Sequence, residues 1–127
     1  MELRDAVEDD SARLADLTGA PRDVMRNLVH DRTVRVAERE DSIAGFVSYD
    51  ARDRTVHVTQ IEGDPEVYLT LLEEPIGFAR TEGMSVEMLV PEDEPAVRDV
   101  ALTAGFEAVG SGPRFEGQPT TKLRISR

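Results

Sequence analysis

The sequence lacks several residue types that carry chemistry in other proteins. It has no cysteine and no tryptophan, and its only histidines are His30 and His57. The lack of cysteine excludes disulfides, thiol nucleophiles and cysteine-based metal sites, and two histidines exclude a histidine-rich site, so we expect no bound metal. No run of about 18 apolar residues occurs, so no segment is predicted to span a membrane.

Positive charge is also scarce, and it is almost entirely arginine. Lys122 is the only lysine among 15 basic residues, against 26 acidic residues, and the formal net charge is −11. Such an acidic, lysine-poor surface suits a halophilic cell, because in molar salt the Debye length falls to about 3 Å and like charges no longer repel. An ordinary acidic protein has the same composition, so both explanations stay open. Nucleic acid is not an expected partner, because its phosphates bind basic surfaces.

The length and composition predict one folded domain over residues 1–127. Apolar residues make up 39% of the chain, which is enough for a core in a domain of this size. The chain does not open with a charged and then apolar leader, so we expect a cytoplasmic location.

Hydrophobic periodicity predicts the elements of the first half of the chain. Alternation of apolar and polar residues predicts strands, whereas apolar residues at i, i+3 and i+4 predict helices. Asp9 or Asp10 can cap the first helix, and Pro21 suits the first turn of the second. The predicted elements are a strand over 2–7, helices over 10–17 and 21–30, and an antiparallel meander over 33–39, 43–50 and 54–61.

The rest of the chain is organised around a long helix between two strands. A turn at Gly63-Asp64-Pro65 leads into a helix over 66–82, which ends at Gly83. Pro75 lies inside that helix and is expected to kink or split it. A strand over 85–90, a helix over 95–104 and strands over 106–109 and 120–126 follow. The order β-α-α-β-β-β-α-β-α-β-β predicts an α/β domain with a mixed sheet.

Short motifs are spread over nearly the whole chain. They include Leu3-Arg4 near the start, Ala79 followed by Gly83 in the centre, and Gly105-Phe106-Glu107 and Gly112-Pro113-Arg114-Phe115 near the end. With the meander and the central helix, they resemble the GCN5-related N-acetyltransferase (GNAT) superfamily. The resemblance implies a GNAT-like acyl-CoA N-acyltransferase fold. It also implies transfer of an acetyl group from acetyl-CoA to an amine of a small molecule or peptide.

In this family a central loop, Arg/Gln-x-x-Gly-x-Gly/Ala, holds the pyrophosphate of CoA with backbone N–H groups at a helix N-terminus. Two registers are open here. Counting back from Gly83 without gaps places Gly63 at the Arg/Gln position, with Glu66 and Tyr68 at the small-residue positions. Alternatively, Gln60-Ile61-Glu62-Gly63-Asp64-Pro65 matches the pattern up to its last residue.

The resemblance further implies which residues hold the cofactor. The strand ending at residues 59–61 would bind the pantetheine arm through its backbone, and the loop that follows would bind the pyrophosphate. Asp64 can also cap the helix itself and so place a carboxylate where a phosphate would lie. The predicted cofactor-binding residues are Thr59, Gln60, Ile61, Gly63, Asp64 and Glu66.

The expected catalytic groups are less complete. The family's tyrosine, which protonates the departing thiolate, corresponds to Ala101, and a nearby asparagine corresponds to Glu94. Glu62, Glu87 and His57 are candidate bases for the amine, although each also fits a solvated strand position.

Two functions therefore stay open: an N-acetyltransferase working by direct attack in a ternary complex, and a non-catalytic GNAT-fold binding or interaction module with a degenerate CoA loop. Residues 114–127 hold four basic residues and one acidic residue, a net +3 in an acidic chain. This contrast allows a homodimer, but charge pairs between neighbouring strands explain it as well.

Overall fold

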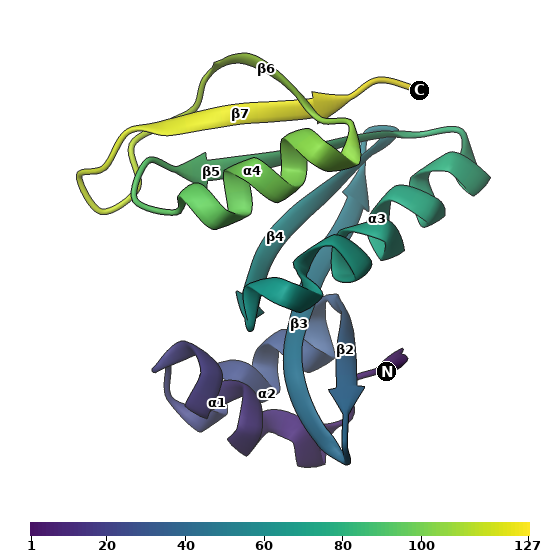
Figure 1. Ribbon diagram of the computed structural model, residues 1–127, viewed down its shortest axis with the longest axis vertical. Helices are drawn as coiled ribbons and strands as arrows, with labels where there is room; N and C mark the ends of the chain where they lie inside the picture. Colours follow the sequence, from purple (N-terminus) through teal and green to yellow (C-terminus); the bar gives the residue numbers. More distant parts are fainter.

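A seven-stranded sheet runs through the molecule in the order β1-β2-β3-β4-β5-β7-β6 (Figure 1). The computed structural model describes the whole chain, Met1–Arg127. Neighbouring strands are antiparallel except for β4 and β5, which are parallel. The strands are β1 (Glu2–Asp5), β2 (Thr33–Arg39), β3 (Ser42–Arg52), β4 (Thr55–Gly63), β5 (Ser85–Pro91), β6 (Glu107–Ser111) and β7 (Thr120–Ile125).

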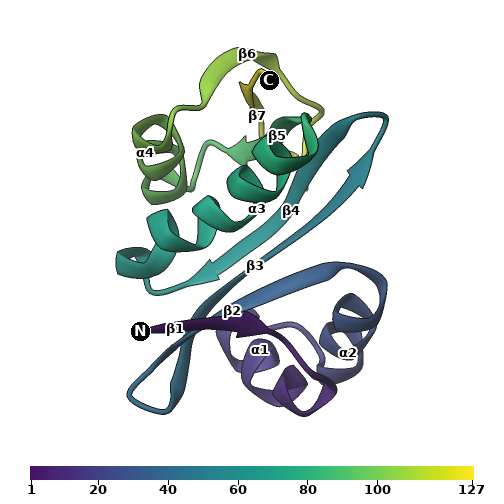
Figure 2. The same ribbon diagram turned by 90° about the vertical axis from the view of Figure 1, so that its right-hand side faces the viewer.

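Four helices cover the sheet, two on each face (Figure 2). On one face, α1 (Ser11–Thr18) and α2 (Arg22–Asp31) pack on β2 and β3. On the other, α3 (Tyr68–Glu82) and α4 (Pro95–Ala104) pack across the centre and the C-terminal half. None of the helices combines the length and apolar character needed to cross a bilayer.

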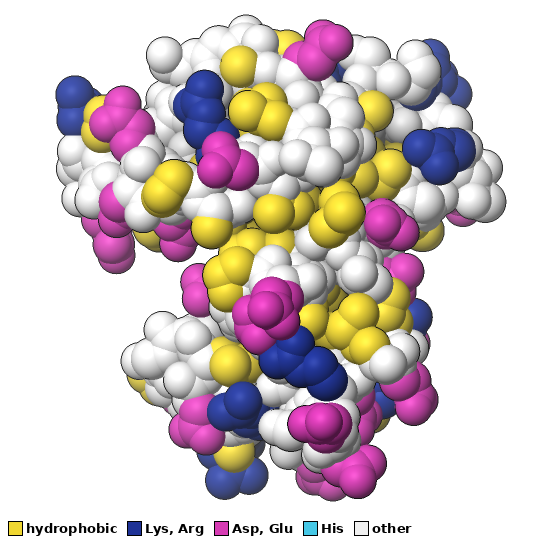
Figure 3. All heavy atoms as spheres, in the orientation of Figure 1, with side chains coloured by type: hydrophobic (Ala, Val, Ile, Leu, Met, Phe, Trp, Pro, Cys, Tyr) yellow, Lys and Arg dark blue, Asp and Glu magenta, His cyan; other side chains and the backbone are white.

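The alternation of side chains along the strands separates two apolar clusters. On β2, Val36 belongs to the cluster under α1 and α2, whereas Ala37 belongs to the cluster under α3 and α4. The first cluster also contains Leu14, Met25 and Phe46. Because α1 and α2 pack on β2, β3 and part of β4, the same face of β5 and β7 is left open. In the view of Figure 3 the molecule narrows between its upper and lower parts, and hydrophobic side chains gather at the narrow zone.

The predicted order of elements and the mixed α/β class are confirmed, with ends that shift by a few residues. The expectation that Pro75 splits the central helix is wrong, because α3 continues through it. Pro75 is itself buried, and the apolar side chains on either side of it, Leu71, Leu72, Ile76 and Ala79, are all in the core. This burial offsets the one backbone hydrogen bond that a proline cannot make.

Candidate active site

A cleft of about 830 Å³ opens where β4 and β5 part, on the sheet face that α1 and α2 leave uncovered. The two strands pair in parallel from Thr55 and Ser85 to Val58 and Met88, and no further. Yet β4 continues to Gly63 and β5 to Pro91. Figure 1 shows that the two strands diverge, with β4 turning steeply away from β5.

The divergence begins at a β-bulge in β4. Tyr49 of β3 pairs with Val58, and Ser48 pairs with Gln60, so Thr59 is the extra residue. A bulge bends its strand, and here the Ser48 and Thr59 hydroxyl oxygens lie 2.7 Å apart and fix the bend. Beyond Val58 no strand pairs with the edge of β4 that faces β5. This edge therefore offers backbone N–H and C=O groups to an extended ligand.

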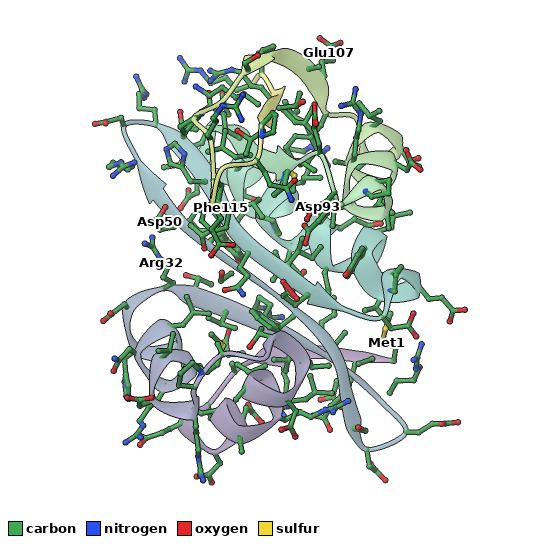
Figure 4. All side chains as sticks on the ribbon, turned by 90° about the vertical axis from the view of Figure 1, so that its left-hand side faces the viewer. Met1, Arg32, Asp50, Asp93, Glu107 and Phe115 are labelled. Carbon is green, nitrogen blue, oxygen red and sulfur yellow. The ribbon has the colours of Figure 1, made fainter.

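The loop between β6 and β7 forms the opposite wall of the cleft. Phe115 and Gln118 exchange two backbone hydrogen bonds of 2.9 Å, and the Thr120 hydroxyl donates to the Pro113 carbonyl over 2.7 Å. These bonds hold the Phe115 ring in a position where it is 61% exposed. Figure 4 shows Phe115 across the cleft from Arg32 and Asp50. The cleft wall is thus fixed by hydrogen bonds within the loop itself.

Charged side chains form a row across the sheet, and the first three of the four line the cleft. Asp50 on β3, His57 on β4, Glu87 on β5 and Arg124 on β7 are successive partners in the strand register. Arg32 pairs with Asp50, and Glu87 pairs with Arg124 and, at 3.6 Å, with Lys122. The Glu87 carboxylate is therefore engaged by two cationic partners.

Glu62 and Glu94 are cleft carboxylates with no ion-pair partner. Both are partly buried. Burial raises the pKa of Glu62, and the negative charge of Glu94 raises it further. Burial likewise raises the pKa of Glu94, with a smaller effect from Asp93. Two unpaired carboxylates with raised pKa values can attract an ammonium group and remove a proton from it.

The loop after β4 has its backbone donors already occupied. Glu66 N–H donates to the Asp64 carboxylate over 3.0 Å, so Asp64 is a cap as predicted, at the 3₁₀ turn Pro65–Val67 that leads into α3. Val67 N–H donates to the Asp64 carbonyl, Tyr68 N–H to the Pro65 carbonyl, and Asp64 N–H to the Ala44 carbonyl. Pro65 has no N–H to offer. This backbone therefore does not fit a pyrophosphate, which needs free N–H groups at a helix N-terminus.

Arg39 at the end of β2 pairs with two carboxylates of this loop. Its guanidinium lies 2.7 Å from the Asp64 carboxylate and 3.5 Å from that of Glu66. The hydrogen bond from Arg39 lowers the pKa of Asp64, and the Glu66 N–H contributes further. Sequence reasoning placed the Asp64 carboxylate at this loop without naming a cationic partner for it. It missed Arg39, which is 25 positions from Asp64 and reaches it only through the pairing of β2, β3 and β4.

Gly63 is required by packing and not by a ligand. A Cβ at this position would lie 2.3 Å from the Ala44 carbonyl oxygen and 2.4 Å from the Gly45 Cα. Its φ of +123° is also unfavourable for other residues. The glycine in this loop therefore serves the close approach of β4 to β3.

No tyrosine lines the cleft. The position expected to hold one is Ala101, which is fully buried in α4. The Tyr68 hydroxyl donates to the Gly63 carbonyl over 3.1 Å, and burial raises its pKa. Tyr49 lies against Phe78 under α3. A phenol that could protonate a leaving group in the cleft is therefore missing.

The predicted site residues divide into two groups. His57, Thr59, Gln60, Ile61, Glu62 and Glu87 line the cleft, whereas Gly63, Asp64 and Glu66 do not. Sequence reasoning did not propose Arg39, Phe115, Arg32 or Asp50 for the site. Only the exposed aromatic in a Gly/Pro-rich loop was a signal that could have drawn attention to Phe115.

No protein-family model and no curated protein sequence matches the chain. Solved structures do. A protein from Desulfovibrio desulfuricans described as a GNAT-family acetyltransferase has a TM-score of 0.78 at 21% identity, covering 98% of both chains. The ribosomal-protein-alanine N-acetyltransferase of Brucella melitensis has a TM-score of 0.82 at 18% identity, covering 100% of both.

A third similar structure includes a ligand. It is YncA of Salmonella typhimurium, described as an acetyltransferase with its cofactor acetyl-CoA, and it has a TM-score of 0.81 at 17% identity. The match covers 99% of this chain and 93% of YncA. The chain therefore has the fold of the GNAT acetyltransferases, as the sequence motifs predicted.

Proposed function

We propose that the chain is an N-acetyltransferase of the GNAT superfamily that moves an acetyl group from acetyl-CoA to an amine. The observation that carries the proposal is Glu62, an unpaired and half-buried carboxylate at the end of the free edge of β4. The similar structures support the reaction class, because they are described as acetyltransferases and one of them with acetyl-CoA.

Each group has a defined task in this proposal. The free edge of β4 at residues 59–61 binds the amide groups of the pantetheine arm, as another strand would. The bound thioester supplies the acetyl group: a new N–C bond forms while the C–S bond breaks. The Glu62 carboxylate takes the proton that the acceptor ammonium must lose, and its raised pKa makes it a stronger base than an exposed glutamate. Glu94 adds a second negative charge that attracts the cation.

The leaving thiolate receives no proton from a side chain, because Ala101 occupies the expected tyrosine position. A thiol has a pKa of about 8.5, so near neutral pH the thiolate can take its proton from water. We therefore expect slow turnover.

A binding module without turnover is the second candidate, since Ala101 and the occupied loop donors both fit it. Such a module would use Glu62 and Glu94 to hold a cationic small molecule or peptide without transferring a group to it.

The test is thiol release from acetyl-CoA with a panel of primary amines, in about 2 M KCl. The proposal expects release with at least one amine and a loss of about 100-fold or more in kcat for Glu62→Gln. Glu92→Gln is the matched control, because it removes the same charge from an exposed residue of the neighbouring loop that does not line the cleft. The acidic limb of the pH profile should move to lower pH in Glu94→Gln, since removing that charge lowers the pKa of Glu62.

Thioester binding without thiol release for any amine would favour the binding module. If His57→Gln abolishes release while Glu62→Gln does not, the base has been assigned to the wrong residue. Absence of both binding and release would reject the acetyltransferase.

A further inference from the structure

We infer that this chain recognises its acetyl donor by the pantetheine thioester alone and makes no use of the diphosphate and nucleotide of CoA. The inference rests on the proposed function and narrows its donor to a chemical class: an acetyl group on the thiol of a pantetheine arm. Acetyl-CoA is then one member of the class, with no advantage over acetyl-pantetheine.

The first support is the state of the loop after β4. A diphosphate binds a helix N-terminus through free N–H groups. Here the N–H groups of Asp64, Glu66, Val67 and Tyr68 all have acceptors within the protein, and Pro65 has none to donate. The Asp64 carboxylate holds the position that an anion would take.

The second support is electrostatic. The basic side chain at this loop, Arg39, already contacts the carboxylates of Asp64 and Glu66. A phosphate would have to displace Asp64 from Arg39 and then lie beside two carboxylates. Two like charges this close repel each other even in water, so the exchange brings little gain.

The third support is the extent of the cleft. Its lining on β4 runs from His57 to Glu62 and includes no residue from 63 to 86. The pantetheine edge and the carboxylates lie inside this range, whereas the loop with Asp64 lies outside it. The part of the site that is open is therefore the part that a pantetheine thioester would fill.

The experiment is a calorimetric titration with acetyl-CoA and with acetyl-pantetheine. It is done in about 2 M KCl, because in dilute buffer the net charge of −11 would repel CoA regardless of contacts. The inference expects dissociation constants that agree within about threefold. At low salt, acetyl-CoA should bind more weakly than acetyl-pantetheine.

Two substitutions of Asp64 separate charge from hydrogen bonding. Asp64→Asn removes the charge but keeps a good cap, whereas Asp64→Gly also frees the Glu66 N–H and Arg39. In molar salt Asp64→Gly should lower the dissociation constant of acetyl-CoA by about tenfold, which is the effect of one or two hydrogen bonds to a charged group. The dissociation constant of acetyl-pantetheine should stay the same. Asp64→Asn should strengthen acetyl-CoA binding by a smaller factor. Asp53→Gly is the matched control, at a turn with a φ of 54° that glycine tolerates.

The outcomes separate the two proposals. Acetyl-CoA binding to the unmodified protein more than about tenfold tighter than acetyl-pantetheine would overturn this inference and leave the acetyltransferase intact. Equal gains for both ligands in Asp64→Gly would overturn the role given to Asp64. If neither thioester binds, the proposed function fails, and this inference fails with it.

Discussion

Gly63 offers a direct test of how closely β4 packs on β3 beside the candidate site, and Gly77 in α3 provides the control. Gly63→Ala places a Cβ 2.3 Å from a backbone oxygen and 2.4 Å from a backbone carbon, at a φ of +123°. Heavy atoms in van der Waals contact lie about 3.5 Å apart or more, so one of the two strands must move by roughly 1 Å. The pairing of Gly45 with Gly63 and the Asp64 N–H bond to Ala44 would be disturbed together.

The expected loss of folding stability follows from these contacts. Backbone strain at an unfavourable φ costs about 1–3 kcal/mol, and one weakened backbone hydrogen bond costs about 1 kcal/mol more. We therefore expect Gly63→Ala to lower the free energy of unfolding by about 3 kcal/mol. The total free energy of unfolding of a domain of this size is roughly 6–19 kcal/mol. The thermal midpoint should fall by roughly 12 °C, at about 4 °C per kcal/mol.

Gly77→Ala is the control with the opposite sign. Gly77 lies inside α3, and a Cβ there meets no atom within 4 Å. Alanine in a helix interior is more favourable than glycine by about 0.5–1 kcal/mol, so the midpoint should rise by about 2–4 °C. Urea denaturation and thermal scans in the same salt measure both variants. A loss below about 1 kcal/mol for Gly63→Ala would refute the packing argument, because β4 could then yield without strain.

Two further predictions concern charge. The thermal midpoint of the unmodified protein should rise steeply from dilute buffer to molar KCl, because salt screens the repulsion within a chain of net charge −11. A midpoint that stays flat or falls in these thermal scans would contradict the halophile explanation. Asp10→Asn should cost about 1–2 kcal/mol near neutral pH, because the carboxylate accepts two hydrogen bonds from Arg4, at 2.8 and 3.0 Å, and one from the Val7 N–H at 2.8 Å. The Arg4 hydrogen bond lowers the pKa of Asp10 in the folded protein, so its contribution is present above the unfolded pKa and is lost as pH falls through the folded one. Urea midpoints should therefore differ near neutral pH and converge in acid; an equal difference at both would show that the charge of Asp10 is irrelevant.

The sequence by itself determined the features that depend on neighbours along the chain. Alternation marked β2, β3 and β4; along β4 it puts Val56 and Val58, which are both in the core, on the face opposite His57. Asp64 was identified as a cap because an Asp before a proline and a helical pattern suits that position whatever the rest of the chain does. Such local preferences decide where an element begins and ends and which of its faces is apolar.

Only the tertiary structure decided how these elements meet. β7 lies between β5 and β6, β4 leaves β5 at the Thr59 bulge, and Glu94 comes close enough to raise the pKa of Glu62. Arg39 joins Asp64 for the same reason: three strands must pair in register before the side chains can touch. Contacts of this kind depend on sheet order, bulges and packing, which no local pattern encodes. The β4 residues of the candidate site and Glu87 could be named from the sequence, but Asp50, Phe115, the charge balance and the occupied loop depend on the assembled sheet.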